Sequence, residues 1–148
     1  MILRSKIRFM IQDSRFMNES NKKKIKDFTD LHAWQESHKL VLLIYKAVKS
    51  FPKEENYALS DQIRRAAVSI TSNIAEGFGR QGFKEKVQFY YLAHGSLTEL
   101  KNQLLVARDV GYLTEAEYSE FTGQANVAHQ LLQGLITKSK SFLVNHKS

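Results

Sequence analysis

Three of the five histidines lie where they could bind a metal or move protons within a helical bundle. His38, His94 and His129 fall on three of the helices predicted below, so they could converge inside a bundle. Di-iron bundles use a Glu-x-x-His motif on each of two helices, and the sequence contains no such motif. Histidines beside an apolar stripe also serve as hydrogen-bonded core or interface residues, which is the interpretation we favour. We therefore expect no metal and no cofactor.

Nucleophilic catalysis and phosphate cradling lack their usual motifs. Serines and histidines are present, but no spacing fixes a nucleophile beside a base. Gly77, Gly79 and Gly82 form a glycine-rich break. A phosphate-binding loop would also need a preceding strand and a following Lys-Ser or Lys-Thr pair, and both are missing. We therefore predict a protein that is not an enzyme.

Basic side chains point to a third chemistry, electrostatic contact with nucleic-acid phosphates. One group brackets the second predicted helix and the glycine-rich break, namely Arg64, Arg65, Arg80, Lys84 and Lys86. A second group lies near the N-terminus, namely Lys22, Lys23, Lys24 and Lys26. The competing interpretation is that these charges are solvated and balanced by neighbouring acids. Glu76, close to several of the arginines, is expected to form a structural ion pair rather than an acid–base centre.

The charge of the chain is unevenly distributed. Its formal net charge is +7, and residues 1–26 contribute +6 of it, with eight basic and two acidic residues. We interpret residues 1–26 as a basic, flexible N-terminal extension and residues 27–148 as one domain. The domain itself is nearly neutral, so any basic surface on it must be a local patch.

Four helices are needed to position these side chains. Apolar residues at spacings of three and four predict helices at about 32–50, 60–76, 83–110 and 115–144. Asp30 is expected to cap the first helix, and Gly77 and Gly111 to end the second and third in left-handed conformation. Thr114 and Glu117 have the spacing of a capping box for the fourth. Short connections predict an all-α, antiparallel up-down-up-down four-helix bundle.

The second helix is expected to be the most enclosed element. Small and polar residues along it would let a neighbouring helix approach closely, and buried polar groups there would need hydrogen-bond partners. Gly95, in the middle of the third helix, is expected to mark that close crossing. The predicted structural residues are Ala67, Ser69, Asn73, Glu76, Gly77 and Gly95.

Several runs of the sequence resemble a known bacterial family. They are Phe51–Tyr57, Gln62–Ile70 (Gln-Ile-Arg-Arg-Ala-Ala-Val-Ser-Ile), Asn73–Gly77 (Asn-Ile-Ala-Glu-Gly), Ala93–Leu100 and Gly111–Leu113. The chain resembles, from about Phe28 onward, the four-helix bundle proteins encoded within intervening sequences of 23S ribosomal RNA genes. The accessory variability determinant of diversity-generating retroelements is a relative of that family. The resemblance implies a homopentamer of four-helix bundles and, from that relative, a basic surface that binds nucleic acid.

Two functions follow from these observations. The first is an oligomeric, non-enzymatic bundle that binds RNA or a ribonucleoprotein partner electrostatically. The alternative is a protein–protein scaffold without nucleic-acid affinity. The first helix is apolar over more than one stripe, and Leu131, Ile136 and Leu143 flank the stripe of the fourth, so we expect an oligomer interface there. Cysteine is absent and no apolar run approaches the ~20 residues of a membrane span, so we expect a cytoplasmic protein that does not bind membranes.

Overall fold

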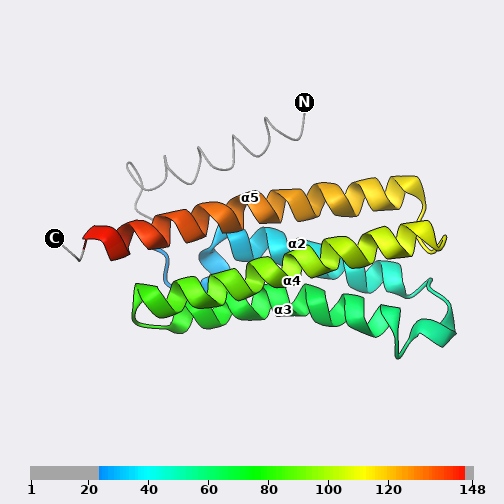
Figure 1. The fold of residues 1–148 in the computed structure, drawn as a ribbon, viewed down its shortest axis with the longest axis horizontal. Helices are drawn as coiled ribbons and strands as arrows, with labels where there is room; N and C mark the ends of the chain where they lie inside the picture. Colours follow the sequence, from blue (N-terminus) through cyan, green and yellow to red (C-terminus); the bar gives the residue numbers. More distant parts are fainter. Residues whose placement is uncertain (1–23, 146–148) are drawn as a thin grey trace.

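The computed structural model describes residues 24–145, which contain four long helices (Figure 1). These are α2 (His32–Val48), α3 (Leu59–Gly79), α4 (Phe83–Asp109) and α5 (Glu115–Asn145), preceded by the short 3-10 turns η1 (Phe28–Asp30) before α2 and η2 (Lys53–Glu55) before α3. Each helix packs against the next, and α5 packs back against α2. The predicted all-α, up-down-up-down four-helix bundle is confirmed. None of the helices in residues 24–145 combines the length and the apolar character that a bilayer crossing requires.

Apolar residues at helical spacing build one continuous core between the four helices. All four contribute side chains that are essentially inaccessible to solvent, among them Leu40, Ile44, Ile63, Ile70, Ile74, Tyr90, Leu97, Leu100, Leu104, Leu132 and Ile136. Because each helix buries one stripe of such residues, its remaining faces are free to carry charged and polar groups.

The turn between α4 and α5 follows its local sequence. Gly111 has a φ of 87°, and the backbone N–H of Tyr112 donates to the carbonyl of Ala107 over 2.8 Å, which closes the end of α4. Thr114 Oγ1 accepts from the N–H of Glu117, and the Glu117 carboxylate accepts from the N–H of Thr114, both over 3.1 Å. The predicted left-handed Gly111 after α4 and the predicted capping box at the start of α5 are both confirmed.

The start of α2 differs from the prediction. Leu31, not Asp30, occupies the N-cap position, and it makes no side-chain cap hydrogen bond. Asp30 belongs to η1, and its carboxylate accepts from the backbone N–H groups of Lys26 and Asp27, each over 3.0 Å. Asp30 therefore stabilises η1 and does not cap α2.

Gly77 lies inside α3 and does not end it, so its predicted role as a left-handed cap is wrong. The helix continues to Gly79, and in residues 24–145 only Gly111 has a positive φ. A Cβ on Gly77 would lie 2.7 Å from Cε1 of Tyr90 and 3.0 Å from Cβ of Phe89. The sequence needs glycine here because α4 approaches the backbone of α3 too closely for a side chain.

The predicted close crossing at Gly95 is also wrong. Gly95 is exposed, and a Cβ there would meet no atom within 4 Å. The contact with α3 is made one residue further on, where Ser96 Oγ lies 2.8 Å from Ser69 Oγ. Asn73 Nδ2 donates to the carbonyl of Ser69 over 2.8 Å and reaches Ser69 Oγ at 3.1 Å. Ala67, also on α3, is completely buried.

A buried carboxylate joins α2 to α5. The Glu36 side chain is only 6% exposed, and its Oε1 pairs with Nζ of Lys39 over 3.0 Å. Gln124 Nε2, from α5, donates to Oε2 of Glu36 over 2.9 Å and to the Glu36 carbonyl over 2.8 Å. The amide of Gln124 therefore satisfies a carboxylate that solvent barely reaches.

Candidate functional site

The five basic residues predicted around α3 do not form one patch. Arg64 and Arg80 lie sixteen positions apart on the same helix, which corresponds to about 24 Å along its axis. The predicted basic edge is therefore divided between the two ends of the bundle, because residues that bracket a long helix in sequence are separated by its full length in space.

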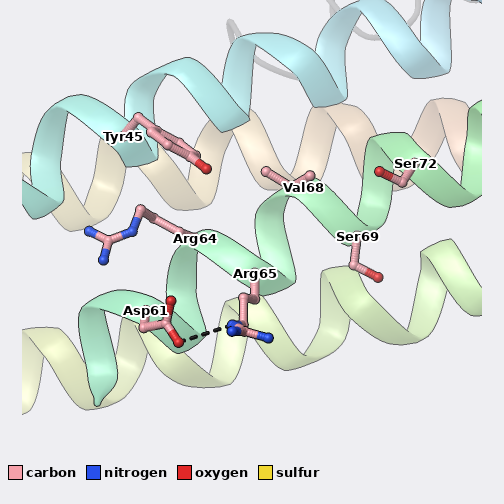
Figure 2. Close-up of a pocket in the computed structure, with 7 residues that line it drawn as sticks. All are labelled: Tyr45, Asp61, Arg64, Arg65, Val68, Ser69 and Ser72. Atoms are coloured by element: carbon pink, nitrogen blue, oxygen red, sulfur yellow. Dashed lines mark hydrogen bonds and ion pairs between the residues drawn. The ribbon is translucent and has the colours of Figure 1, made fainter. Parts of the chain in front are cut away.

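Arg64 and Arg65 are already engaged with groups near the start of α3. Arg65 Nε pairs with Asp61 Oδ2 over 2.9 Å, and Arg64 Nη2 donates to the carbonyl of Asn56 over 3.2 Å. Both arginines border a shallow groove of about 380 Å³ between α2 and α3, which Tyr45 borders from the α2 side (Figure 2). Arg65 is therefore paired with a carboxylate, whereas Arg64 is held by a backbone carbonyl.

The other three basic residues gather where α3 ends and α4 begins. Arg80 is the C-cap of α3, and its guanidinium lies 4.7 Å from the centre of the Phe89 ring. Lys84 is exposed in the first turn of α4. Lys86 Nζ donates to the carbonyl of Phe78 over 2.6 Å, and burial lowers the pKa of Lys86. Lys86 thus closes the last turn of α3, while Arg80 and Lys84 remain available to solvent.

The described part of the N-terminal chain adds two further cations at this end. Lys24 and Lys26 are exposed and directly precede η1, which packs against α2 and α3. Figure 1 shows this start of the described chain near the α3–α4 turn. Lys22 and Lys23 lie outside the described residues. We call Lys24, Lys26, Arg80, Lys84 and Lys86 the basic end.

The ion pair predicted for Glu76 is not found among residues 24–145. Glu76 is exposed, and the described ion pairs are Lys39–Glu36, Arg65–Asp61 and Arg108–Asp109. Arg65 is paired with Asp61 instead, and the guanidinium of Arg80 lies over the ring of Phe89. No ion pair joins a member of the basic end to a described carboxylate.

Two of the three candidate histidines do come together. His94 Nε2, from α4, lies 2.9 Å from His129 Nε2, from α5, and both rings are half-buried. Lys101 Nζ lies 2.9 Å from the other ring nitrogen of His129, Nδ1. His38 is not part of this cluster, because its ring stacks on Trp34 at a centroid distance of 4.6 Å. We call the cluster the Lys101–His129–His94 chain.

The surroundings of the histidine pair are wrong for a metal. A histidine ligand normally donates its second ring N–H to a carboxylate or carbonyl. On His129 that second nitrogen faces the ammonium of Lys101, which can only donate. Within residues 24–145 no cluster of three or more His, Asp or Glu side chains is positioned to hold a metal ion. The arrangement of these three side chains therefore fits a row of hydrogen bonds between α4 and α5 better than a metal site.

An exposed apolar surface on α4 was not foreseen. Its members fall into two groups, Tyr91 and Leu92 in the first half of α4 and Leu105, Val106 and Val110 at its C-terminal end, with the exposed polar residues Thr98, Glu99 and Asn102 between them. Leu92 is 57% and Val110 56% exposed. We call this set the outer α4 face. By contrast, Leu131 and Ile136, which were expected at an oligomer interface, are buried in the core. The signal was present in the sequence, because α4 carries apolar residues on more than one side.

Comparisons with known proteins agree with this fold. A family model described as 23S rRNA-intervening sequence protein matches residues 29–134, more than two thirds of the chain. A solved structure of a protein with unknown function, from the S23 ribosomal protein family of Bacteroides thetaiotaomicron VPI-5482, is similar with a TM-score of 0.66 and 22% identity. The similarity covers 71% of this chain and 95% of that one, and at this identity it speaks for the fold alone. No curated protein matches. The family match over most of the chain shows that it belongs to the 23S rRNA-intervening sequence protein family.

Proposed function

We propose that this protein is a non-enzymatic, cytoplasmic, oligomeric bundle that binds RNA, alone or within a ribonucleoprotein, through electrostatic contacts at the basic end. The observation that carries the proposal is the concentration of cations without ion-pair partners among residues 24–145 where α3 meets α4. Family membership places the protein among those named for intervening sequences of 23S ribosomal RNA. The relation to the accessory variability determinant is part of this proposal.

Binding at such a surface would be governed by phosphate charge rather than by base identity. Arg80 and Lys84 offer exposed donors, and Lys24 and Lys26 are exposed just before η1. Neutralising phosphates releases condensed counterions, so affinity should fall steeply as salt rises. We expect little preference for one RNA sequence over another.

Oligomerisation would make this modest patch effective. A second copy could cover the two apolar groups of the outer α4 face, which would remove exposed apolar side chains from water. The resemblance to the family implies a pentamer. Several copies would present several basic ends to one RNA, and their combined affinity would exceed that of each.

The second candidate is a protein–protein scaffold without nucleic-acid affinity. The outer α4 face favours it, since the same apolar residues could receive a different protein. The two functions differ in what the basic end does, because a pure scaffold would not need it.

The test is RNA binding measured by fluorescence anisotropy at low salt, with full-length protein and with a variant lacking residues 1–26. The proposal expects both to bind, with weaker binding after the deletion because Lys24 and Lys26 are lost with the extension. If affinity vanishes on deletion, residues 1–26 carry the binding, and Arg80, Lys84 and Lys86 do not bind RNA by themselves. Absence of binding by the full-length protein would favour the scaffold. Sedimentation on the same samples tests the oligomer, and a lone 17.1 kDa species at micromolar concentration would contradict it.

A further inference from the structure

The hydrogen bonds of the Lys101–His129–His94 chain can run in only one direction when Lys101 is charged. An ammonium donates and cannot accept, so Nδ1 of His129 must be the acceptor of the 2.9 Å contact. A neutral imidazole carries one proton, which then sits on Nε2 of His129 and points at Nε2 of His94, also 2.9 Å away. Nε2 of His94 must accept, and its own proton lies on Nδ1. One lysine thus fixes the tautomers of two histidines on different helices.

Protonation of either imidazole breaks this arrangement. A proton added to His129 goes to Nδ1, where it meets the ammonium of Lys101 as a second donor. A proton added to His94 goes to Nε2, where it meets the N–H of His129. In both cases one hydrogen bond between α4 and α5 is replaced by two donors that face each other, and a protonated His129 also places its positive charge against the ammonium of Lys101.

No described carboxylate is positioned to absorb the added charge. The charged groups that act on His129 are Lys101 and His94, both from α4. Further along the same α4–α5 contact, cations face aromatic rings, with Lys140 over Tyr91 and Arg108 over Tyr118. From α2, the other helix packed against α5, the carboxylate of Glu36 reaches α5, but it is bound to Lys39 and Gln124.

We propose that the Lys101–His129–His94 chain is a proton-responsive contact between α4 and α5, closed while both imidazoles are neutral and opened by mild acid. The inference does not depend on RNA binding. Burial lowers the pKa of His129, and the charge of Lys101, together with that of His94 when His94 is protonated, lowers it further. Burial also lowers the pKa of Lys101. The folded protein therefore resists the proton that the unfolded chain accepts.

The direction of the stability change follows from that difference. Because folding lowers the pKa of His129, its contribution is fully present above the ordinary histidine pKa of about 6.5. It is lost as the pH falls from there toward the folded-state pKa of His129. Each pH unit within that window reduces the ratio of folded to unfolded protein by about tenfold for each such proton.

The first test reads the tautomers directly by ¹⁵N NMR of the histidine rings in the full-length protein at pH 8. If the Lys101–His129–His94 chain is arranged as proposed, the neutral ring carries its proton on Nε2 in His129 and on Nδ1 in His94. The opposite assignment, or the ordinary mixture found in exposed histidines, would overturn the proposal. This measurement uses the wild-type protein, so it stands even if a variant fails to fold.

The second test follows the melting temperature from pH 8 to pH 5 in the wild type, in His129→Gln and in His38→Gln. Wild type and His38→Gln should lose stability alike, because His38 stacks on Trp34 away from the chain, whereas His129→Gln should lose less. Lys101→Met should raise the pKa of His129 by removing the ammonium. An unchanged pH response in His129→Gln would refute the proposal. Strong stabilisation of wild type, but not of His129→Gln, by Zn²⁺ would also refute it, because the pair would then be a metal site.

Discussion

Replacing Gly77 with alanine tests a close contact between α3 and α4. In an open helix interior this change gains about 1 kcal/mol, since alanine is the better helix former. Here the new Cβ would lie 2.7 Å from Cε1 and 2.9 Å from Cδ1 of Tyr90, and 3.0 Å from Cβ of Phe89. Carbon atoms prefer about 3.5–4.0 Å, so α3 and α4 must separate by several tenths of an ångström or more.

The size of the stability loss depends on whether Tyr90 can move away from the new Cβ. Tyr90 is 2% exposed and packed in the core, so its ring has little room to move. Overpacking of this kind costs about 1–3 kcal/mol, and we expect the upper part of that range. After subtracting the gain in helix propensity, Gly77→Ala should lose about 2 kcal/mol of unfolding free energy. For a chain of this length the melting temperature should fall by about 4–8 °C.

Gly95→Ala is the matched control, because Gly95 is also inside a helix but a Cβ there meets nothing within 4 Å. It should gain about 1 kcal/mol. Thermal and urea unfolding of the two variants should therefore differ by about 3 kcal/mol in opposite directions from wild type. Burial raises the pKa of Tyr90 to about 12, and a tyrosine displaced in Gly77→Ala should titrate closer to 10. Equal stabilisation by both alanines would refute the close approach of α3 and α4.

Three further substitutions probe other parts of the fold. Ala67→Leu should lose about 1–3 kcal/mol in urea unfolding, because Ala67 is fully buried, whereas Ala116→Leu on the exposed first turn of α5 should be nearly neutral; equal effects would show that Ala67 has room beside it. Gly111→Ala should lose about 1–2 kcal/mol, because alanine is strained at a φ of 87°, and an unchanged melting temperature would contradict the left-handed turn. Gln124→Leu should lose about 1–3 kcal/mol by leaving the Glu36 carboxylate without its amide donor, and a more stable Gln124→Leu protein would show that this hydrogen bond is dispensable.

The fold was predictable because its signals are local. Apolar spacing defined the four helices, and the Gly111 turn and the Thr114–Glu117 box are complete within a few residues. Gly77 was correctly predicted to be structurally important, but glycine is needed there because Tyr90 of α4 packs against its backbone. Close packing between two helices leaves no local sequence pattern that distinguishes such a glycine from a helix cap.

The candidate site was less accessible from sequence. Neighbouring basic residues were grouped by their order in the chain, although Arg64 and Arg80 stand at opposite ends of a rigid helix. His94 and His129 could be placed on adjacent helices, but their pairing and the position of Lys101 depend on the register of α4 against α5. Helix periodicity gives the face of each residue and leaves that register open.

The basic end is tested most directly by RNA affinity at several salt concentrations in two charge-matched variants. Arg80→Gln with Lys84→Gln removes two exposed cations from the basic end, and Arg64→Gln with Arg65→Gln removes two from the opposite end of α3. The first variant should bind more weakly at low salt, and its plot of log affinity against log salt should be shallower by about 1 per lost phosphate contact. The second should bind like wild type. Equal losses in both variants, or a loss only in the second, would contradict RNA binding at the basic end.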